Sequence, residues 1–297
     1  MSGRALPPAP EGAALHFLYD SVCGRKLLKV LTARPVSAAA GRFMDSGLSR
    51  PLIRPFIRKN KIAMADYLPM RYDNFNAFFC RPVRPELRPL PDESSAFMAP
   101  CDGLLSAYRI TGGLVLPIKQ SRYTAAELLG GDASAETFRD GVCLVFRLCV
   151  NHYHRYAYAD DGVILKKRFL PGVLHTVRPI ALSALPVFTQ NCRELMLLRT
   201  AHFGLLAQIE VGAMLVGKIE NYKGEGVSFR RGEEKGRFLY GGSTVVVLLE
   251  KGRVQLDEAL FESTAQGLET PVILGEVLGR ALLSGQPGGN SREKAFS

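Results

Sequence analysis

The feature that most constrains this chain is a series of short apolar runs, rich in β-branched residues and punctuated by glycine, that begins near residue 95. The runs are LLSAYRI, GLVLPI, GVCLVFRLCV, LLAQIEVGAMLVGKI and STVVVLLEKG. Segments of this composition, bounded by turn-forming residues, are typical of β-strands. They predict a mainly antiparallel β domain with few helices, one of which is expected near TAAELLGG.

The first 65 residues have a different character. Residues 1–61 hold eleven Lys and Arg against three Asp and Glu, so this segment carries +8 of the chain's net charge of +10. The pattern from Leu15 to Leu31 suits an amphipathic helix better than a strand, and SRPLIRPFIRKNKI is a second basic, partly apolar segment. We therefore predict an α+β protein with a basic helical region over 1–65, a β-rich domain over 66–285 and a flexible tail over 286–297.

The two basic segments can lie on an anionic lipid surface, where each cation near the headgroups contributes about 1 kcal/mol. The alternative is that they are ordinary helices that pack on the core with a solvated basic face. Nucleic acid is not an expected partner, because the sequence contains no helix-turn-helix, zinc-finger or RNP-like pattern. No apolar run reaches the length of about 18 residues that a spanning helix needs, and no secretory signal is evident.

The six cysteines are scattered, without the paired Cys/His spacing that builds a zinc site. We expect reduced, mostly buried thiols and no bound metal. The charged stretch RRGEEKG is expected to form a solvated hairpin.

One short segment attracts attention on chemical grounds. In FLYGGSTVVVLLEKG, Gly241 and Gly242 precede Ser243 at the start of a very apolar strand. Taken alone, a Gly-Gly-Ser turn before a strand is a common structural feature and predicts nothing further.

Six segments in order nevertheless give the chain a specific likeness. They are APCDG (99–103), YHR (153–155), PGVLHTV (171–177), VGAMLVGKI (211–219), FRRGEEKGRF (229–238) and GGST (241–244). Together they resemble the phosphatidylserine decarboxylase family. The resemblance implies a carboxy-lyase that converts phosphatidylserine to phosphatidylethanolamine and CO2 through a Schiff base on a pyruvoyl group.

The resemblance also implies that the protein makes this group itself by cleavage at Gly242–Ser243. Attack of the Ser243 hydroxyl on the Gly242 carbonyl gives an ester, elimination gives dehydroalanine, and hydrolysis leaves the pyruvoyl group. Glycine suits position 242 because it lacks Cβ and tolerates unusual backbone angles. No separate cofactor is then required.

An alcohol needs a base, and the base needs an orienting group. The resemblance assigns these roles to a histidine and to Asp102. The family pattern places a second histidine after Tyr-His-Arg and an aromatic residue, but here that position is Ala157. His154 holds the matched position and is the preferred base and later proton donor; His152 and His175 are the alternatives. A continuous strand through this segment would put His152 and His154 on one face.

The partners that the resemblance implies are phosphatidylserine in an anionic membrane and two chains, α and β, from one precursor. It places the protein peripherally at the cytoplasmic face of the cell membrane, and it is compatible with a homodimer. Two alternatives stay open: a pyruvoyl decarboxylase for another amino-acid-bearing substrate, and a cleavage-deficient relative that binds anionic membranes.

Overall fold

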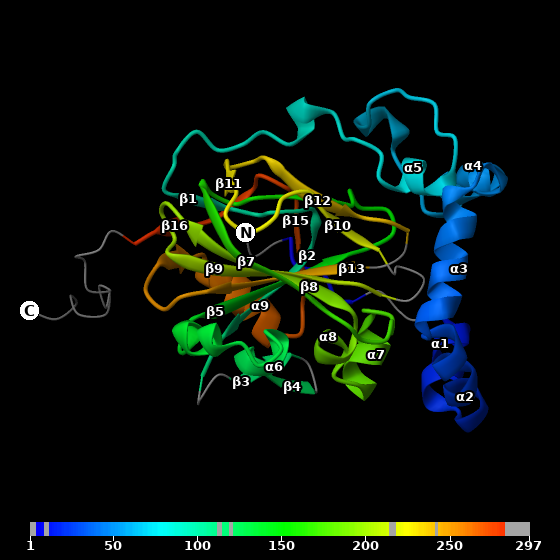
Figure 1. Ribbon diagram of the computed structural model, residues 1–297, viewed down its shortest axis with the longest axis horizontal. Helices are drawn as coiled ribbons and strands as arrows, with labels where there is room; N and C mark the ends of the chain where they lie inside the picture. The colour runs from blue at the N-terminus through cyan, green and yellow to red at the C-terminus, as the bar shows by residue number, and fades with distance from the viewer. Residues whose placement is uncertain are drawn as a thin grey trace, which may run out of the picture.

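The computed structural model describes residues 4–8, 12–111, 115–118, 121–213, 218–240 and 243–282. The N-terminal helices gather at one end of the molecule, beyond the strand ends of a large β-sheet (Figure 1). This arrangement confirms the α+β prediction. The predicted tail over 286–297 lies outside the described residues.

The N-terminal part is helical, as predicted, but its helices are short. The expected helix from Leu15 to Leu31 is two helices, because the backbone at Ser21 is extended and its hydroxyl caps the second one by accepting from the Gly24 N–H. Gly24 allows this tight break, since a Cβ there would lie 1.9 Å from the Phe17 carbonyl oxygen. The helices of this part are α1 (Ala13–Asp20), α2 (Val22–Leu31), α3 (Arg34–Asp45), α4 (Ile53–Lys59) and α5 (Phe75–Phe79).

None of the helices in the described segments has the length and apolar character that crossing a bilayer requires.

Four short helices accompany the β part. They are α6 (Ala125–Leu128), α7 (Pro179–Ala184), α8 (Val187–Gln190) and α9 (Glu258–Ala265). The first of them confirms the helix expected at TAAELLGG, and Thr124 and Glu127 form its capping box.

An eight-stranded antiparallel sheet forms the centre, in the order β11-β7-β8-β9-β13-β5-β2-β15. Four of the predicted apolar runs supply the inner strands β2, β5, β9 and β13, but the inner strands β7 and β8 were not among the predicted runs. The run GLVLPI contributes to a separate hairpin, β3 with β4, and is only partly described. The sheet consists of β2 (Gly103–Arg109), β5 (Val142–Leu148), β7 (Gly162–Leu170), β8 (Arg193–Thr200), β9 (Leu205–Val211), β11 (Ser228–Phe229), β13 (Ser243–Leu249) and β15 (Thr270–Val272).

The sheet is covered on both faces, which explains why β13 is apolar without alternation. Val246 and Leu248 belong to one core cluster and Val245, Val247 and Leu249 to the other. The second cluster lies under two three-stranded sheets, ordered β10-β12-β6 and β1-β16-β14. Their strands, with the hairpin pair, are β1 (Ala96–Met98), β3 (Val115–Ile118), β4 (Ser121–Thr124), β6 (Arg155–Ala157), β10 (Ile219–Asn221), β12 (Glu234–Phe238), β14 (Val254–Leu256) and β16 (Val277–Ala281).

A buried ion pair joins the large sheet to one of the small ones. Lys235 of β12 lies 2.7 Å from both carboxylate oxygens of Glu210 in β9, and Asn221 of β10 bonds to both residues. Both charged side chains are fully buried. The expectation of a solvated hairpin at RRGEEKG is therefore wrong for Lys235, because an acid across the layer compensates its charge.

We predict that Lys235→Met strongly destabilises the protein, by about 3–5 kcal/mol, because it leaves the Glu210 carboxylate buried without its cation. The double variant Glu210→Gln with Lys235→Met should lose much less. The measurement is urea unfolding in the Ser243→Ala background, where every sample is expected to be one intact chain. A loss below about 1 kcal/mol in the single variant would contradict the structural role of this pair.

Candidate active site

Ser243 is the first residue of β13, an inner strand that pairs with β9 and β5. It pairs with Leu148 of β5, and the next residue, Thr244, pairs with both Arg147 of β5 and Val211 of β9. Ser243 is fully buried, and its Oγ has no hydrogen-bond partner among the described residues. A buried hydroxyl that lacks a partner is costly, so this one needs an explanation. Gly241 and Gly242, and so the predicted cleavage bond, lie outside the described residues.

His154 precedes β6 and is also fully buried. Its Nδ1 lies 2.9 Å from the His152 carbonyl oxygen, which only accepts, so Nδ1 carries the proton. The Nε2 lone pair then points into the interior, where the described residues offer it no partner. Burial, and then the charges of His152 and Arg81, lower the pKa of His154 well below its usual range. The ring is therefore a neutral base at physiological pH.

The structure links His154 to the segment before Ser243 through one aromatic ring. Phe79 of α5 has its ring centroid 4.0 Å from that of His154 and 5.4 Å from that of Tyr240. The Tyr240 N–H donates to Asn76 Oδ1 at 2.8 Å, which fixes the chain three residues before Ser243. The unpartnered acceptor on His154 is thus connected through Phe79 to the segment that leads to Ser243, and no hydrogen bond joins the two side chains.

Asp102 lies in the turn before β2, two strands away from β13 in the sheet. Arg88 binds its carboxylate with two hydrogen bonds, of 2.8 and 2.6 Å, and the Leu274 N–H donates to Oδ1 at 3.0 Å. Asp102 makes no hydrogen bond to His154. Its charge acts instead on His152, where it raises the pKa and so partly offsets the lowering by burial. No sequence pattern identifies Arg88 as its partner.

Ala157 marks the position where the family pattern has a second histidine. Its N–H donates to the Pro100 carbonyl at 2.8 Å, which places it beside the turn that carries Asp102. A cavity of about 400 Å³ adjoins it, with Arg88, Tyr153 and Leu274 among the lining residues. The small side chain thus leaves space near Asp102, and Arg88 takes the carboxylate.

The two alternative histidines each have a partner. His152 Nδ1 accepts from the Cys149 N–H at 3.1 Å, and burial lowers its pKa. His175 Nδ1 lies 3.4 Å from the Tyr19 hydroxyl of α1, and burial lowers its pKa as well. The two histidines before β6 do not share the face of one strand, because β5 ends at Leu148 and a turn follows. Of the three, His154 alone has a buried ring nitrogen without a partner in the described parts.

Sequence reasoning did not single out Arg81. This side chain is fully buried, its guanidinium lies 4.1 Å from the Tyr67 ring centroid, and it donates to the Tyr67 hydroxyl at 3.1 Å and to the Asn151 carbonyl at 3.3 Å. In the described structure no carboxylate pairs with it. Its charge favours the neutral form of His154. In the sequence, Arg81 is one of several arginines in the proline-rich segment RPVRPELRPL, so no local signal could have identified it.

The described residues contain no cluster of three or more His, Cys, Asp or Glu side chains that could hold a metal ion. All six cysteines are free thiols and four of them are buried, as expected.

Comparison with known proteins gives a consistent result. Residues 75–280 match the family model described as phosphatidylserine decarboxylase. The chain is 40% identical to phosphatidylserine decarboxylase proenzyme 2 of Clostridium acetobutylicum, covering 91% of this chain and 92% of the relative. It is 35% identical to a proenzyme of Ruminiclostridium cellulolyticum (91% and 92% covered) and 34% identical to one of Clostridium perfringens (89% and 92%). The chain therefore belongs to the phosphatidylserine decarboxylase family.

Proposed function

We propose that this protein is a phosphatidylserine decarboxylase proenzyme, which cleaves itself between Gly242 and Ser243 and then converts phosphatidylserine to phosphatidylethanolamine and CO2. The names of its relatives support the reaction and the precursor. The observation that carries the proposal is a pair of buried groups without hydrogen-bond partners among the described residues, Ser243 Oγ at the start of β13 and His154 Nε2 just before β6. A site of this kind is prepared for proton transfer from the hydroxyl to the ring.

Self-cleavage begins when Ser243 Oγ gives its proton to His154 Nε2 and bonds to the Gly242 carbonyl carbon. The peptide C–N bond breaks, and its nitrogen takes up a proton as the free amine, which leaves an ester. Removal of the Ser243 α-proton then expels the Gly242 carboxylate and forms dehydroalanine. Hydrolysis of its imine form releases ammonia, so that the β chain ends at Gly242 and the α chain begins with the pyruvoyl group.

The residues around Ser243 fit this group. The pyruvoyl group would occupy the buried position of Ser243 and supply an electrophilic carbonyl that accepts electrons when CO2 leaves the substrate. His154 reaches the same buried region from β6 and is the candidate to return a proton to the substrate carbon. The His152 carbonyl fixes the tautomer of His154. Asp102, held by Arg88, sets the charge next to His152.

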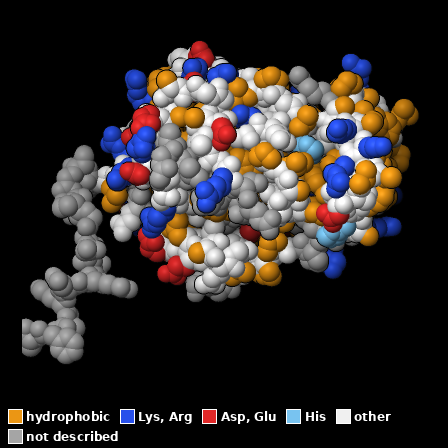
Figure 2. Space-filling view, turned by 90° about the horizontal axis from the view of Figure 1, so that it is seen from below, with side chains coloured by type: hydrophobic (Ala, Val, Ile, Leu, Met, Phe, Trp, Pro, Cys, Tyr) orange, Lys and Arg blue, Asp and Glu red, His pale blue; other side chains and the backbone are white. Residues whose placement is uncertain are grey.

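The basic helical region over 1–65 is proposed to hold the enzyme on an anionic membrane, peripherally and at its cytoplasmic face. Several apolar side chains of the helical part are exposed: Phe17, Val22, Leu27, Val30, Phe43, Leu48 and Leu52. Figure 2 shows hydrophobic and basic side chains mixed at the end of the molecule that carries these helices. Such a surface combines insertion of apolar groups with attraction to acidic headgroups.

One observation favours a second candidate. Ala157 removes the family's second histidine, so a cleavage-deficient relative that only binds anionic membranes is the rival proposal. It requires one intact chain of 32.5 kDa.

We predict that the purified protein consists of two chains divided at Gly242–Ser243, the smaller one blocked at its N-terminus, whereas Ser243→Ala stays whole. Intact mass spectrometry decides this, because the alanine lacks the attacking oxygen. Thr244→Val, which alters the neighbouring buried hydroxyl, should still cleave and serves as the control. A single unmodified wild-type chain in folded protein would overturn the proposal and favour the membrane-binding relative.

The rate of self-cleavage should be insensitive to pH between about 8 and 6 and fall only in more acidic solution. The reason is that the lowered pKa of His154 keeps its ring neutral as the pH falls through the usual histidine range. Below about pH 6.5 the unfolded chain binds a proton that the folded chain does not, so the stability falls there too. Cell-free synthesised precursor, sampled over time on gels, gives the rate, with folding checked at each pH. The His154→Asn variant should not cleave itself. Self-cleavage of this variant at the wild-type rate would refute the role of His154 as the base.

Binding to vesicles should require both acidic lipid and the exposed apolar helical residues. Leu48, 78% exposed, and Val22, 63% exposed, are the most accessible, and replacing both with Asp should weaken co-flotation about tenfold or more with phosphatidylserine vesicles. Val227→Asp, the same type of change at one exposed residue near β11, should bind as the wild type does. Equal flotation of all three proteins would rule out this surface as the contact.

A further inference from the structure

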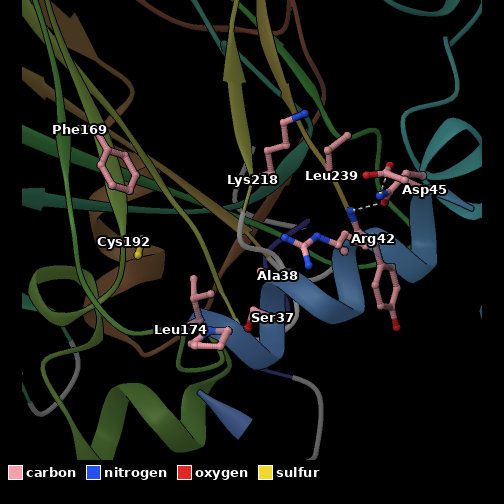
Figure 3. Close-up of a pocket in the computed structure, with 13 residues that line it drawn as sticks. Ser37, Ala38, Arg42, Asp45, Phe169, Leu174, Cys192, Lys218 and Leu239 are labelled. Atoms are coloured by element: carbon pink, nitrogen blue, oxygen red, sulfur yellow. Dashed lines mark hydrogen bonds between the residues drawn. The ribbon is translucent and has the colours of Figure 1, made fainter. Parts of the chain in front are cut away.

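A pocket with a volume of about 750 Å³ lies between α3 and the β part. Figure 3 shows α3 along one side of it, with Phe169, Leu174 and Cys192 on the other. Ser37, Ala38, Gly41, Arg42 and Asp45 line it from one face of α3, and Pro35 in the first turn of the helix adds to the lining. Ser37, Ala38 and Gly41 are small, which leaves the space open.

The pocket adjoins the proposed active site. Tyr240, three residues before Ser243, lines it. Cys192 lies on the far side of the pocket, and its carbonyl accepts a hydrogen bond from the Gly212 N–H. The strand register places Cys192, Gly212 and Ser243 next to one another across β8, β9 and β13. Strands lie about 4.8 Å apart, so Cys192 is about 10 Å from Ser243 across the sheet. A ligand in the pocket is within reach of position 243.

Two polar groups in the pocket have no partner in the described structure. Ser37 is 2% exposed, and its Oγ is buried without a hydrogen bond. The Arg42 guanidinium extends from α3 into the space and makes no ion pair or hydrogen bond with any described residue (Figure 3). The other charged groups are already engaged, since Lys218 pairs with Glu220 at 2.6 Å and Asp45 accepts from Asn76 at 2.8 Å.

The chemistry of these groups defines a ligand class. Arginine stays protonated and matches the geometry of phosphate oxygens. The Ser37 hydroxyl can donate to an ester carbonyl. Leu174, Leu239 and Phe169 supply apolar wall. An anionic group, an ester and an adjoining apolar part in one molecule are the features of a glycerophospholipid, and a volume of this size suits a small-molecule site.

We propose that this pocket binds the phosphodiester and the adjoining glycerol ester of the phospholipid substrate, with Arg42 on the phosphate and Ser37 on an ester carbonyl. The inference rests on the proposed function for the identity of the headgroup. It assigns to α3 a direct part in recognising the substrate: the helix holds the phosphate while the amino acid of the headgroup extends towards position 243.

The test measures binding rather than turnover, in the uncleaved Ser243→Ala protein. The probe is dihexanoyl phosphatidylserine below its micelle concentration, titrated by calorimetry, so that neither the membrane surface nor the pyruvoyl group contributes. Arg42→Gln should weaken binding about tenfold or more, because it removes the charge opposite the phosphate. Gly41→Leu should weaken it similarly by filling the pocket.

The design guards against misfolding. A Cβ at Gly41 meets nothing within 4 Å, and leucine favours a helix more than glycine does, so Gly41→Leu is compatible with folded α3. Ala39→Leu, on the same helix but outside the pocket, and Arg122→Gln, an exposed arginine elsewhere, match the two changes and should bind as the parent does. Glycerophosphoserine, which lacks the acyl chains, should bind more weakly than the lipid but still depend on Arg42.

Each outcome of the titrations either supports or overturns the proposed phospholipid site. Loss of binding in Arg42→Gln and Gly41→Leu with normal binding in both controls supports the pocket. Parent-like affinity in both pocket variants overturns it, as does equal weakening by the controls. If inorganic phosphate competes as well as the lipid binds, the site takes free phosphate and the lipid assignment fails. Because the assay needs no self-cleavage, failure of the decarboxylase proposal would appear separately, in the mass spectrum.

Discussion

The pairing of β13 with β9 and β5 along its whole length is the constraint on which the site depends. It fixes Ser243 opposite Leu148 and leaves its hydroxyl without a partner in the described interior. An unsatisfied buried hydroxyl costs on the order of 1–3 kcal/mol. Burial of one large aliphatic side chain contributes about 1.5–3 kcal/mol, and Val245 to Leu249 are all buried, so the strand outweighs the cost at its first two residues. The sheet can therefore hold Ser243 in an unfavourable environment.

A cluster of aromatic rings extends this control to the helical part. The rings of Phe75 and Phe79 in α5 lie 4.8 and 5.4 Å from that of Tyr240, and Phe79 also contacts His154. The helices are thus part of the wall of the proposed site, since they contact both His154 and the segment that leads to Ser243. In the proposed function, one end of the helical part contacts the membrane and the other end contacts the active site. The aromatic cluster therefore connects membrane binding to the chemistry.

Much of the fold was predictable because it depends on local pattern. The apolar runs predicted four of the inner strands, although not β7 and β8, and Thr124 and Glu127 mark a helix start that can be recognised in the sequence. What could not be predicted depends on contacts between distant residues. Lys235 lies in a run of charges that resembles a solvated turn, and only Glu210, 25 positions away, makes its burial tolerable. Ser21 breaks a helix that amphipathic spacing alone would continue, because Gly24 permits the two pieces to approach closely.

The same limit applied to the site. The sequence motifs selected Ser243, His154 and Asp102, but the connections between them come from elsewhere. Arg88 occupies the carboxylate of Asp102, and a peptide carbonyl, that of His152, orients the base. A carbonyl cannot be protonated in the physiological range, so it fixes the His154 tautomer at any pH at which the chain is folded. With Ala157 in place of a histidine, the orientation of the proposed base, His154, thus requires no charged side chain in direct contact with it. The Asp102 charge instead acts on His152, where it raises the pKa.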